Sequence, residues 1–190
     1  MTLRKCSSAL ALVIASAVPV ASYAIDIRPV VVFGLEFGGE EIATTTSGGS
    51  LKFNELFSLG GGASFLTDSK DIEVQVTLAW KYGNLNASDG SVSFTRYPLD
   101  ALVFYRFPNK FRVGGGLTYH LNPKFSADGT AKPLDGLKFD NALGEVLQVD
   151  YLFTEKASIG LRYTHLDYKT KVSGVSFSSN GGGVMFGFRF

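Results

Sequence analysis

Apolar side chains alternate with small or polar ones along eight separate stretches of this 190-residue chain. In the clearest stretch, 72–82, one face carries Ile72, Val74, Val76, Leu78, Trp80 and Tyr82, and the other carries Glu73, Gln75, Thr77, Ala79 and Lys81. Successive side chains of a β-strand point to opposite faces, so this period of two indicates strands. The other stretches are 31–37, 57–65, 97–107, 111–121, 147–153, 159–163 and 183–190. The sequence therefore predicts an all-β fold of eight strands.

The connections between these stretches alternate in length. Those at 67–71, 108–110 and 155–157 are short, whereas those at 84–92, 121–136 and 168–175 are longer and polar, with 44–50 a brief member of the long set. Short turns on one side and longer loops on the other are typical of an antiparallel up-and-down transmembrane β-barrel. Pro98 lacks a backbone donor, so we expect regular pairing to weaken there.

The N-terminal residues have the pattern of a secretory signal peptide. Arg4 and Lys5 precede an apolar run at 9–20, and Ser22-Tyr23-Ala24 provides small residues before a cleavage point. We expect residues 1–24 to be removed, which leaves a barrel domain of residues 25–190 without cysteine. The apolar run is too short for a membrane helix.

Composition excludes several functional classes. The formal net charge of +1 argues against a nucleic-acid partner, which requires a basic surplus. Two isolated histidines provide no metal site, and no glycine cluster has the lysine and hydroxyl of a phosphate loop. We therefore expect no cofactor and no metal.

Alternation alone does not decide which face points outward. A soluble periplasmic barrel that binds a ligand inside would bury the apolar face, whereas a membrane barrel presents it to lipid. Glycines on the polar face, aromatics at strand ends and strand length favour lipid: the ten steps of 72–82, at ~3.3 Å and a tilt of ~40°, rise about 25 Å, the height of an apolar membrane band.

The C-terminal motif Val184-Met185-Phe186-Gly187-Phe188-Arg189-Phe190 completes a resemblance to small eight-stranded outer-membrane barrels of the OmpX and OmpA transmembrane-domain type. The resemblance implies a location in the outer membrane of a Gram-negative bacterium, contact with outer-membrane lipid and lipopolysaccharide, and a monomer. It also implies that Phe186, Phe188 and Phe190 form the signal read by the barrel-assembly machinery. We expect a structural or surface-interaction role; a narrow channel or a carrier of small hydrophobic molecules is the alternative.

Charges on the polar face are expected to fill the lumen as a structural network rather than to line a wide pore. They are Glu36, Glu73, Lys81, Asp100, Arg106, Arg112, Asp150, Arg162 and Arg189. Buried charges must be paired or hydrated. If Phe153 pairs with Ile159, Asp150 lies opposite Arg162, and we predict a contact between them. His120 is expected to form a hydrogen bond in the lumen.

His165 is the one candidate for catalysis. Some small outer-membrane barrels resemble this region in carrying a histidine followed two residues later by a nucleophilic serine, as in lipid A deacylases. Here that position is Asp167; Ser176, Ser178 and Ser179 are the nearby alternatives, but nothing in the sequence shows that any of them lies beside the histidine. Nucleophilic catalysis needs a positioned nucleophile and base, so we expect no enzymatic activity.

Overall fold

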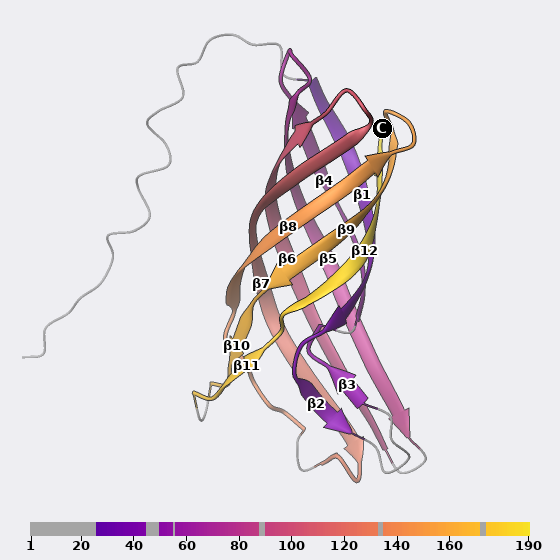
Figure 1. Ribbon diagram of the computed structural model, residues 1–190. Helices are drawn as coiled ribbons and strands as arrows, with labels where there is room; N and C mark the ends of the chain where they lie inside the picture. Colours follow the sequence, from indigo (N-terminus) through magenta and orange to yellow (C-terminus); the bar gives the residue numbers. More distant parts are fainter. Residues whose placement is uncertain (1–25, 45–49, 55, 88–89, 133–134, 172–173) are drawn as a thin grey trace, which may run out of the picture.

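Eight strands close into a barrel in which all neighbouring strands are antiparallel (Figure 1). The computed structural model describes residues 26–44, 50–54, 56–87, 90–132, 135–171 and 174–190. The barrel strands are β1 (Asp26–Gly38), β4 (Leu56–Leu66), β5 (Ile72–Ala87), β6 (Gly90–Arg106), β7 (Phe111–Gly129), β8 (Ala142–Leu152), β9 (Ala157–His165) and β12 (Gly181–Arg189). β12 closes the circle by pairing with β1. Each predicted stretch lies in one of these strands, to within one residue at its end, so the predicted fold is confirmed.

The two ends of the barrel differ in their connections. Short turns at 67–71, 107–110 and 153–156 form one end, which we call the turn end. The opposite, loop end carries the hairpin of β2 (Glu41–Thr44) and β3 (Ser50–Lys52) and that of β10 (Asp167–Lys169) and β11 (Ser176–Ser178). In Figure 1 the turn end is at the top, beside the C-terminus. The expected signal peptide, 1–24, lies outside the described residues.

Within the described part of the chain, no helix is long and apolar enough to cross a membrane.

Strands β5, β6 and β7 continue far into the loop end. The expectation of loops at 84–92 and 121–136 was therefore wrong over much of their length: Asn84 pairs with Ser93, and Phe94 pairs with Phe125. The reason is that the apolar side chains move from the outer face of the strands to the inner face. Beyond the apolar band the inward side chains become apolar and the outward ones polar, so the strands continue as the wall of an ordinary water-soluble sheet.

Pairing does weaken at Pro98, as predicted. The β5–β6 ladder gives no partner to Tyr97 or Pro98 and resumes where Arg96 faces Lys81. The β6–β7 register also shifts between Thr95 and Tyr97. The irregularity separates the apolar band of β6 from its extension.

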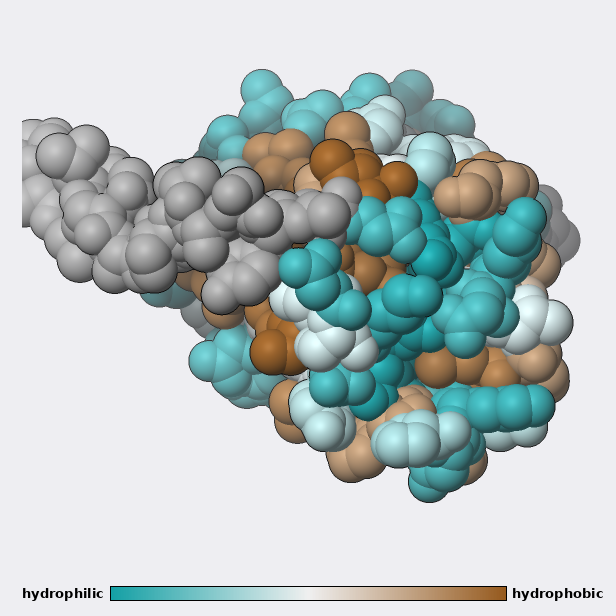
Figure 2. All heavy atoms as spheres, turned by 90° about the horizontal axis from the view of Figure 1, so that it is seen from above, coloured by the Kyte–Doolittle hydropathy of each residue, from teal (hydrophilic) through white to brown (hydrophobic). Residues whose placement is uncertain are grey.

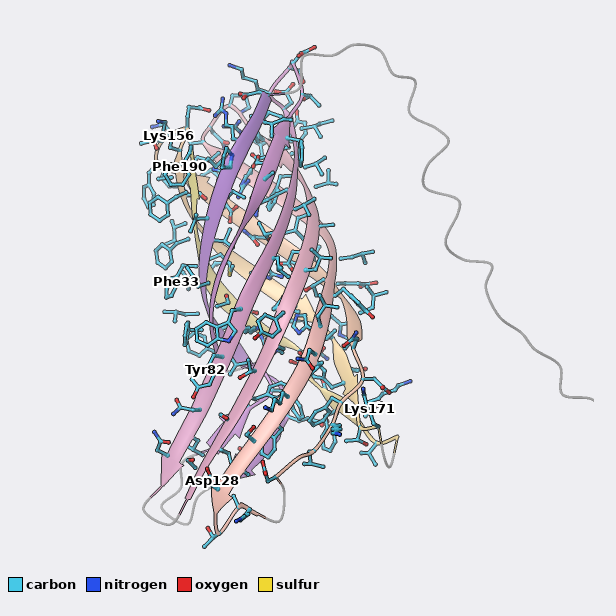
Figure 3. All side chains as sticks on the ribbon, turned by 180° about the vertical axis from the view of Figure 1, so that it is seen from behind. Phe33, Tyr82, Asp128, Lys156, Lys171 and Phe190 are labelled. Atoms are coloured by element: carbon cyan, nitrogen blue, oxygen red, sulfur yellow. The ribbon has the colours of Figure 1, made fainter. Side chains whose placement is uncertain are left out.

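The apolar face is on the outside. Leu161 and Phe188 are 68% and 51% exposed, whereas Arg189 and Lys81 are 2% and 1% exposed. Figure 3 shows Phe33 and Phe190 on the outer side of the wall, and Figure 2, which looks onto the turn end, shows hydrophilic residues gathered around that mouth. A soluble barrel with an apolar interior is thereby excluded, because so continuous an apolar coat is not presented to water.

Candidate functional site: the filled lumen

Glu73 is the centre of the charges at the turn end of the lumen. Its carboxylate accepts hydrogen bonds from Arg112 at 2.6 Å, Arg189 at 3.0 Å and Ser64 at 2.7 Å. A third guanidinium, that of Arg106, approaches within 3.9 Å. These side chains point inward from five strands, so a single buried carboxylate ties strands together across the lumen. Three cations around it compensate the cost of burying its charge.

Asp150 binds Arg112 at 2.6 Å and not Arg162, so the predicted contact was wrong. The β8–β9 ladder places Asp150 opposite Gly160 and Gln148 opposite Arg162, a register two residues away from the one expected. A shift by two leaves every side chain on the same face, and the alternation therefore does not distinguish these registers. Arg162 instead reaches across the lumen to Asp100 at 2.8 Å.

A second ionic layer lies nearer the loop end. Glu36 and Lys81 form an ion pair at 2.8 Å, and the Lys81 ammonium also donates to the Asn54 side-chain oxygen at 2.8 Å. With the Arg162–Asp100 pair, this layer spans β1, β5, β6 and β9. Eight of the nine expected lumen charges are buried; the ninth, Arg106, reaches the turn-end surface and pairs there with Glu155 at 2.9 Å.

Arg96 is a tenth lumen charge, which the sequence reasoning missed. It is 0% exposed and donates to the Phe53 carbonyl oxygen at 2.6 Å. Its guanidinium carbon lies 4.7 Å from the ring centroid of Phe94 and 5.5 Å from that of Tyr168, within the range of cation–π attraction. The inward phase of β6 passes through Asp100 and continues to Arg96, so extending that alternation beyond Pro98 would have found it.

On the loop-end side of Arg96, aromatic side chains fill the lumen. Phe53, which follows β3, lies with its ring centroid 5.4 Å from Phe94, 5.6 Å from Phe139, 5.5 Å from Tyr168 and 5.3 Å from Phe177. We call these five residues the aromatic cap. Both extra hairpins and the strand extensions contribute to it, and it closes the mouth of the barrel with apolar side chains.

His120 is buried beneath the cap and forms a hydrogen bond with the Tyr168 hydroxyl, as expected of a lumen histidine. Burial raises the pKa of Tyr168, so its phenol stays protonated and available for this bond.

Little free space remains between the ionic layers. Among the described residues, one internal cavity lies between these layers, with a volume of about 10 Å³. It is bordered by Gln75, Thr77, Arg112 and Arg162. That is room for about one water molecule. Glycines contribute to the narrowness: a Cβ added to Gly62 would lie 1.9 Å from the carbonyl oxygen of Val76.

Among the described residues of the outer wall, the sequence candidate for catalysis is not joined to a nucleophile. His165 and Asp167 are exposed near the loop end, and Glu145 lies directly opposite His165 on β8. Among the described hydrogen bonds, none joins a serine hydroxyl to His165. No three histidine, cysteine or acidic side chains of the described residues converge as metal ligands would.

The C-terminal phenylalanines lie on the outside of β12, near the turn end. Phe188 and Phe190 are 51% and 69% exposed, and the ring of Phe186 lies 6.1 Å from that of Phe33 on β1. Alternate side chains of this segment point to opposite faces, so the phenylalanines point outward and Arg189 points inward.

Comparisons with known proteins agree with this architecture. The family model described as outer membrane protein beta-barrel domain matches residues 8–190. No curated protein sequence matches. Among solved structures, that of Ail from Yersinia pestis in complex with the heparin analogue sucrose octasulfate has a TM-score of 0.51 at 16% identity, over 86% of this chain and 97% of that chain. Two further structures are similar: OprG from Pseudomonas aeruginosa (TM-score 0.49, 16% identity, 87% of this chain and 94% of that chain) and Neisserial surface protein A (TM-score 0.48, 15% identity, 87% and 95%).

At 16% identity the Ail structure bears on the fold alone, whereas the family model covers nearly the whole chain. The exposed apolar band, the closed ring of eight strands and this match lead to one conclusion. The chain belongs to the outer membrane protein beta-barrel domain family and resides in the outer membrane of a Gram-negative bacterium.

Proposed function

We propose that this protein is a sealed, monomeric barrel with a structural or surface-interaction role, and that it does not conduct solutes. One observation carries the proposal: among the described residues, two ionic layers and the aromatic cap occupy successive levels of the lumen. A small eight-stranded barrel has an interior just wide enough for side chains, whereas aqueous channels belong to much larger barrels.

Two different kinds of closure act in series. An ion passing from the turn end would first have to separate Glu73 from its arginines, and then Glu36 from Lys81. Beyond them it would meet Phe53 and its aromatic neighbours, which form a largely apolar layer. Each barrier involves buried groups whose partners come from several strands, and we expect this cross-linking to keep the path closed.

The carrier alternative requires an opening through the wall or along the lumen. Backbone ladders join all eight neighbouring strand pairs of the barrel. The segment before β8 is also bridged to β7 and to Thr170, just after β10. Binding of small hydrophobic molecules to protein purified from outer membranes would support that alternative, and absence of binding would favour the sealed barrel.

Planar-bilayer recording tests the sealed lumen. We expect the protein to insert without stable conductance steps, while a 16-stranded porin recorded in the same bilayers gives large ones. Large, stable steps from this protein would contradict the proposal. Because the wild-type protein is measured, no variant has to fold for the test to be decisive.

We also propose that the outward phenylalanines of β12 serve as the signal for the barrel-assembly machinery. Phe190→Ala is expected to lower the amount of folded protein in outer membranes, and Phe37→Ala, which removes an exposed phenylalanine from β1, serves as the matched control. Equal amounts of folded protein from the two variants would count against this role.

A further inference from the structure

Three lysines lie side by side at the loop end, on β7 and on two neighbouring segments. Lys124 of β7 bridges directly to Lys138, which lies in the segment before β8. Lys171, just after β10, donates its backbone N–H to the carbonyl oxygen of Lys138 at 2.9 Å, which puts it opposite Lys138 on the other side. Strands are about 4.8 Å apart, so the row extends roughly 10 Å around the wall. We call these residues the lysine row.

The row points outward, away from the aromatic cap. All three lysines are exposed, whereas Phe125 and Phe139, the next residues after Lys124 and Lys138, are buried inside. Figure 3 shows Lys171 on the flank of the loop end, far from Lys156 and Phe190 at the turn end.

Among the described residues, no carboxylate lies at ion-pair distance from the row, although Asp140 is exposed on the same face as Lys138. No ion pair within 4 Å joins any of its lysines to a carboxylate. The nearest acid along the ladder is Asp140, whose backbone N–H pairs with the carbonyl oxygen of Lys169, and Lys169 adds a further cation beside it. Like charges directly opposite each other destabilise a sheet, so this arrangement favours binding of an anion.

The height of the row identifies the compartment that it faces. Lys124 is thirteen residues beyond Phe111, which lies at the turn-end margin of the apolar band. At ~3.3 Å per residue and a tilt of ~40°, the row lies about 33 Å above that margin, roughly 8 Å beyond an apolar band of ~25 Å. The turn end is periplasmic in barrels of this kind, so the row lies at the level of the headgroups of the outer leaflet.

We propose that Lys124, Lys138 and Lys171 bind the phosphate groups of lipopolysaccharide in the surrounding outer leaflet. The row faces sideways at headgroup height, where a neighbouring glycolipid presents phosphates and where no desolvation of a buried site is required. Lys169 extends the cationic surface toward the membrane. The proposal goes beyond the sealed lumen and does not depend on it, because the lysine row is entirely on the outer wall.

Binding of labelled lipopolysaccharide to protein purified from outer membranes in detergent tests the proposal. One variant combines Lys124→Gln, Lys138→Gln and Lys171→Gln. The matched control combines Lys70→Gln, Lys110→Gln and Lys156→Gln, which removes the same charge from the turn end. Migration on a gel before and after boiling reports whether each variant is folded. If the row variant does not fold, Lys138→Gln alone removes the central lysine.

The row variant is expected to bind at least tenfold more weakly than wild type, and Lys138→Gln alone about threefold more weakly, while the control stays within twofold. Removing the phosphates from lipopolysaccharide is expected to weaken its binding to the wild-type protein. The loss should be at least as large as the loss seen when intact lipopolysaccharide binds the row variant. Unchanged affinity of the row variant, equal losses in the row and control variants, or full binding of the phosphate-free lipid would overturn the proposal. So would a soluble sulfated polysaccharide that binds the row when lipopolysaccharide does not.

Discussion

Replacement of Glu73 by glutamine removes the only negative charge that Arg112 and Arg189 share in the described lumen, without leaving a large void. The side chain is fully buried, and it accepts hydrogen bonds from both guanidinium groups and from Ser64. Arg112 retains Asp150, but Arg189 has no other carboxylate within ion-pair distance among the described residues. Removing one partner of a buried ion pair costs about 3–5 kcal/mol, because the remaining charge stays buried. We therefore expect Glu73→Gln to lower the free energy of unfolding by about that amount.

The matched control is Glu155→Gln, because Glu155 also contacts Arg106 but lies 72% exposed at the turn end. An exposed pair of this kind contributes about 0–1 kcal/mol. The assay is reversible urea unfolding in lipid vesicles, followed by the fluorescence of Trp80 and by the band shift on boiling. A loss below about 1 kcal/mol for Glu73→Gln, or equal losses for both variants, would refute the view that this network stabilises the barrel.

Three further changes test other parts of the structure. Gly62→Ala places a Cβ 1.9 Å from a carbonyl oxygen of β5 and should lower the free energy of unfolding by about 1–3 kcal/mol. Gly61→Ala, whose added Cβ has its nearest atom at 3.4 Å, should leave that free energy nearly unchanged. Equal effects of the two substitutions would argue against a tightly packed lumen. Phe53→Ala should increase hydrogen exchange of loop-end amides by removing the centre of the aromatic cap, and unchanged exchange there would contradict its closure. The hydrogen bond from Arg106 lowers the pKa of Glu155. The small contribution of this pair to the free energy of unfolding should therefore be present above the unfolded carboxyl pKa of about 4.3 and be lost as pH falls through the lower folded value. A difference in unfolding free energy between wild type and Glu155→Gln that grows in acid would have the wrong sign.

The strands and their faces were predictable because the membrane imposes the period of two on long, uninterrupted stretches. Val76 and Leu161 had to be outside if Lys81 and Arg189 were inside, and the structure shows both. The same period explains the error at Asp150. Registers that differ by two residues have identical faces, so only the geometry of the turn at 153–156 separates them.

The aromatic cap could not be predicted from alternation alone. Phe53 directly follows one short hairpin and Phe177 belongs to the other, and neither hairpin has an extended pattern. Phe53 meets Phe177 and also Phe94, which lies between the predicted loop at 84–92 and the predicted strand at 97–107. Such contacts depend on the closing of the barrel, which brings segments distant in sequence to one mouth. Arg96 was missed for the related reason that Pro98 interrupts the alternation that leads to it.

Quenching of tryptophan fluorescence provides the most direct test of which side of this barrel meets lipid. Trp80 is the only tryptophan in the chain, and it lies 39% exposed on the outer face, stacked on Tyr82. In vesicles of lipids brominated on their acyl chains, its emission is expected to be strongly quenched, while aqueous iodide has little effect. Strong quenching by iodide with no response to the brominated lipids would contradict the membrane-facing orientation.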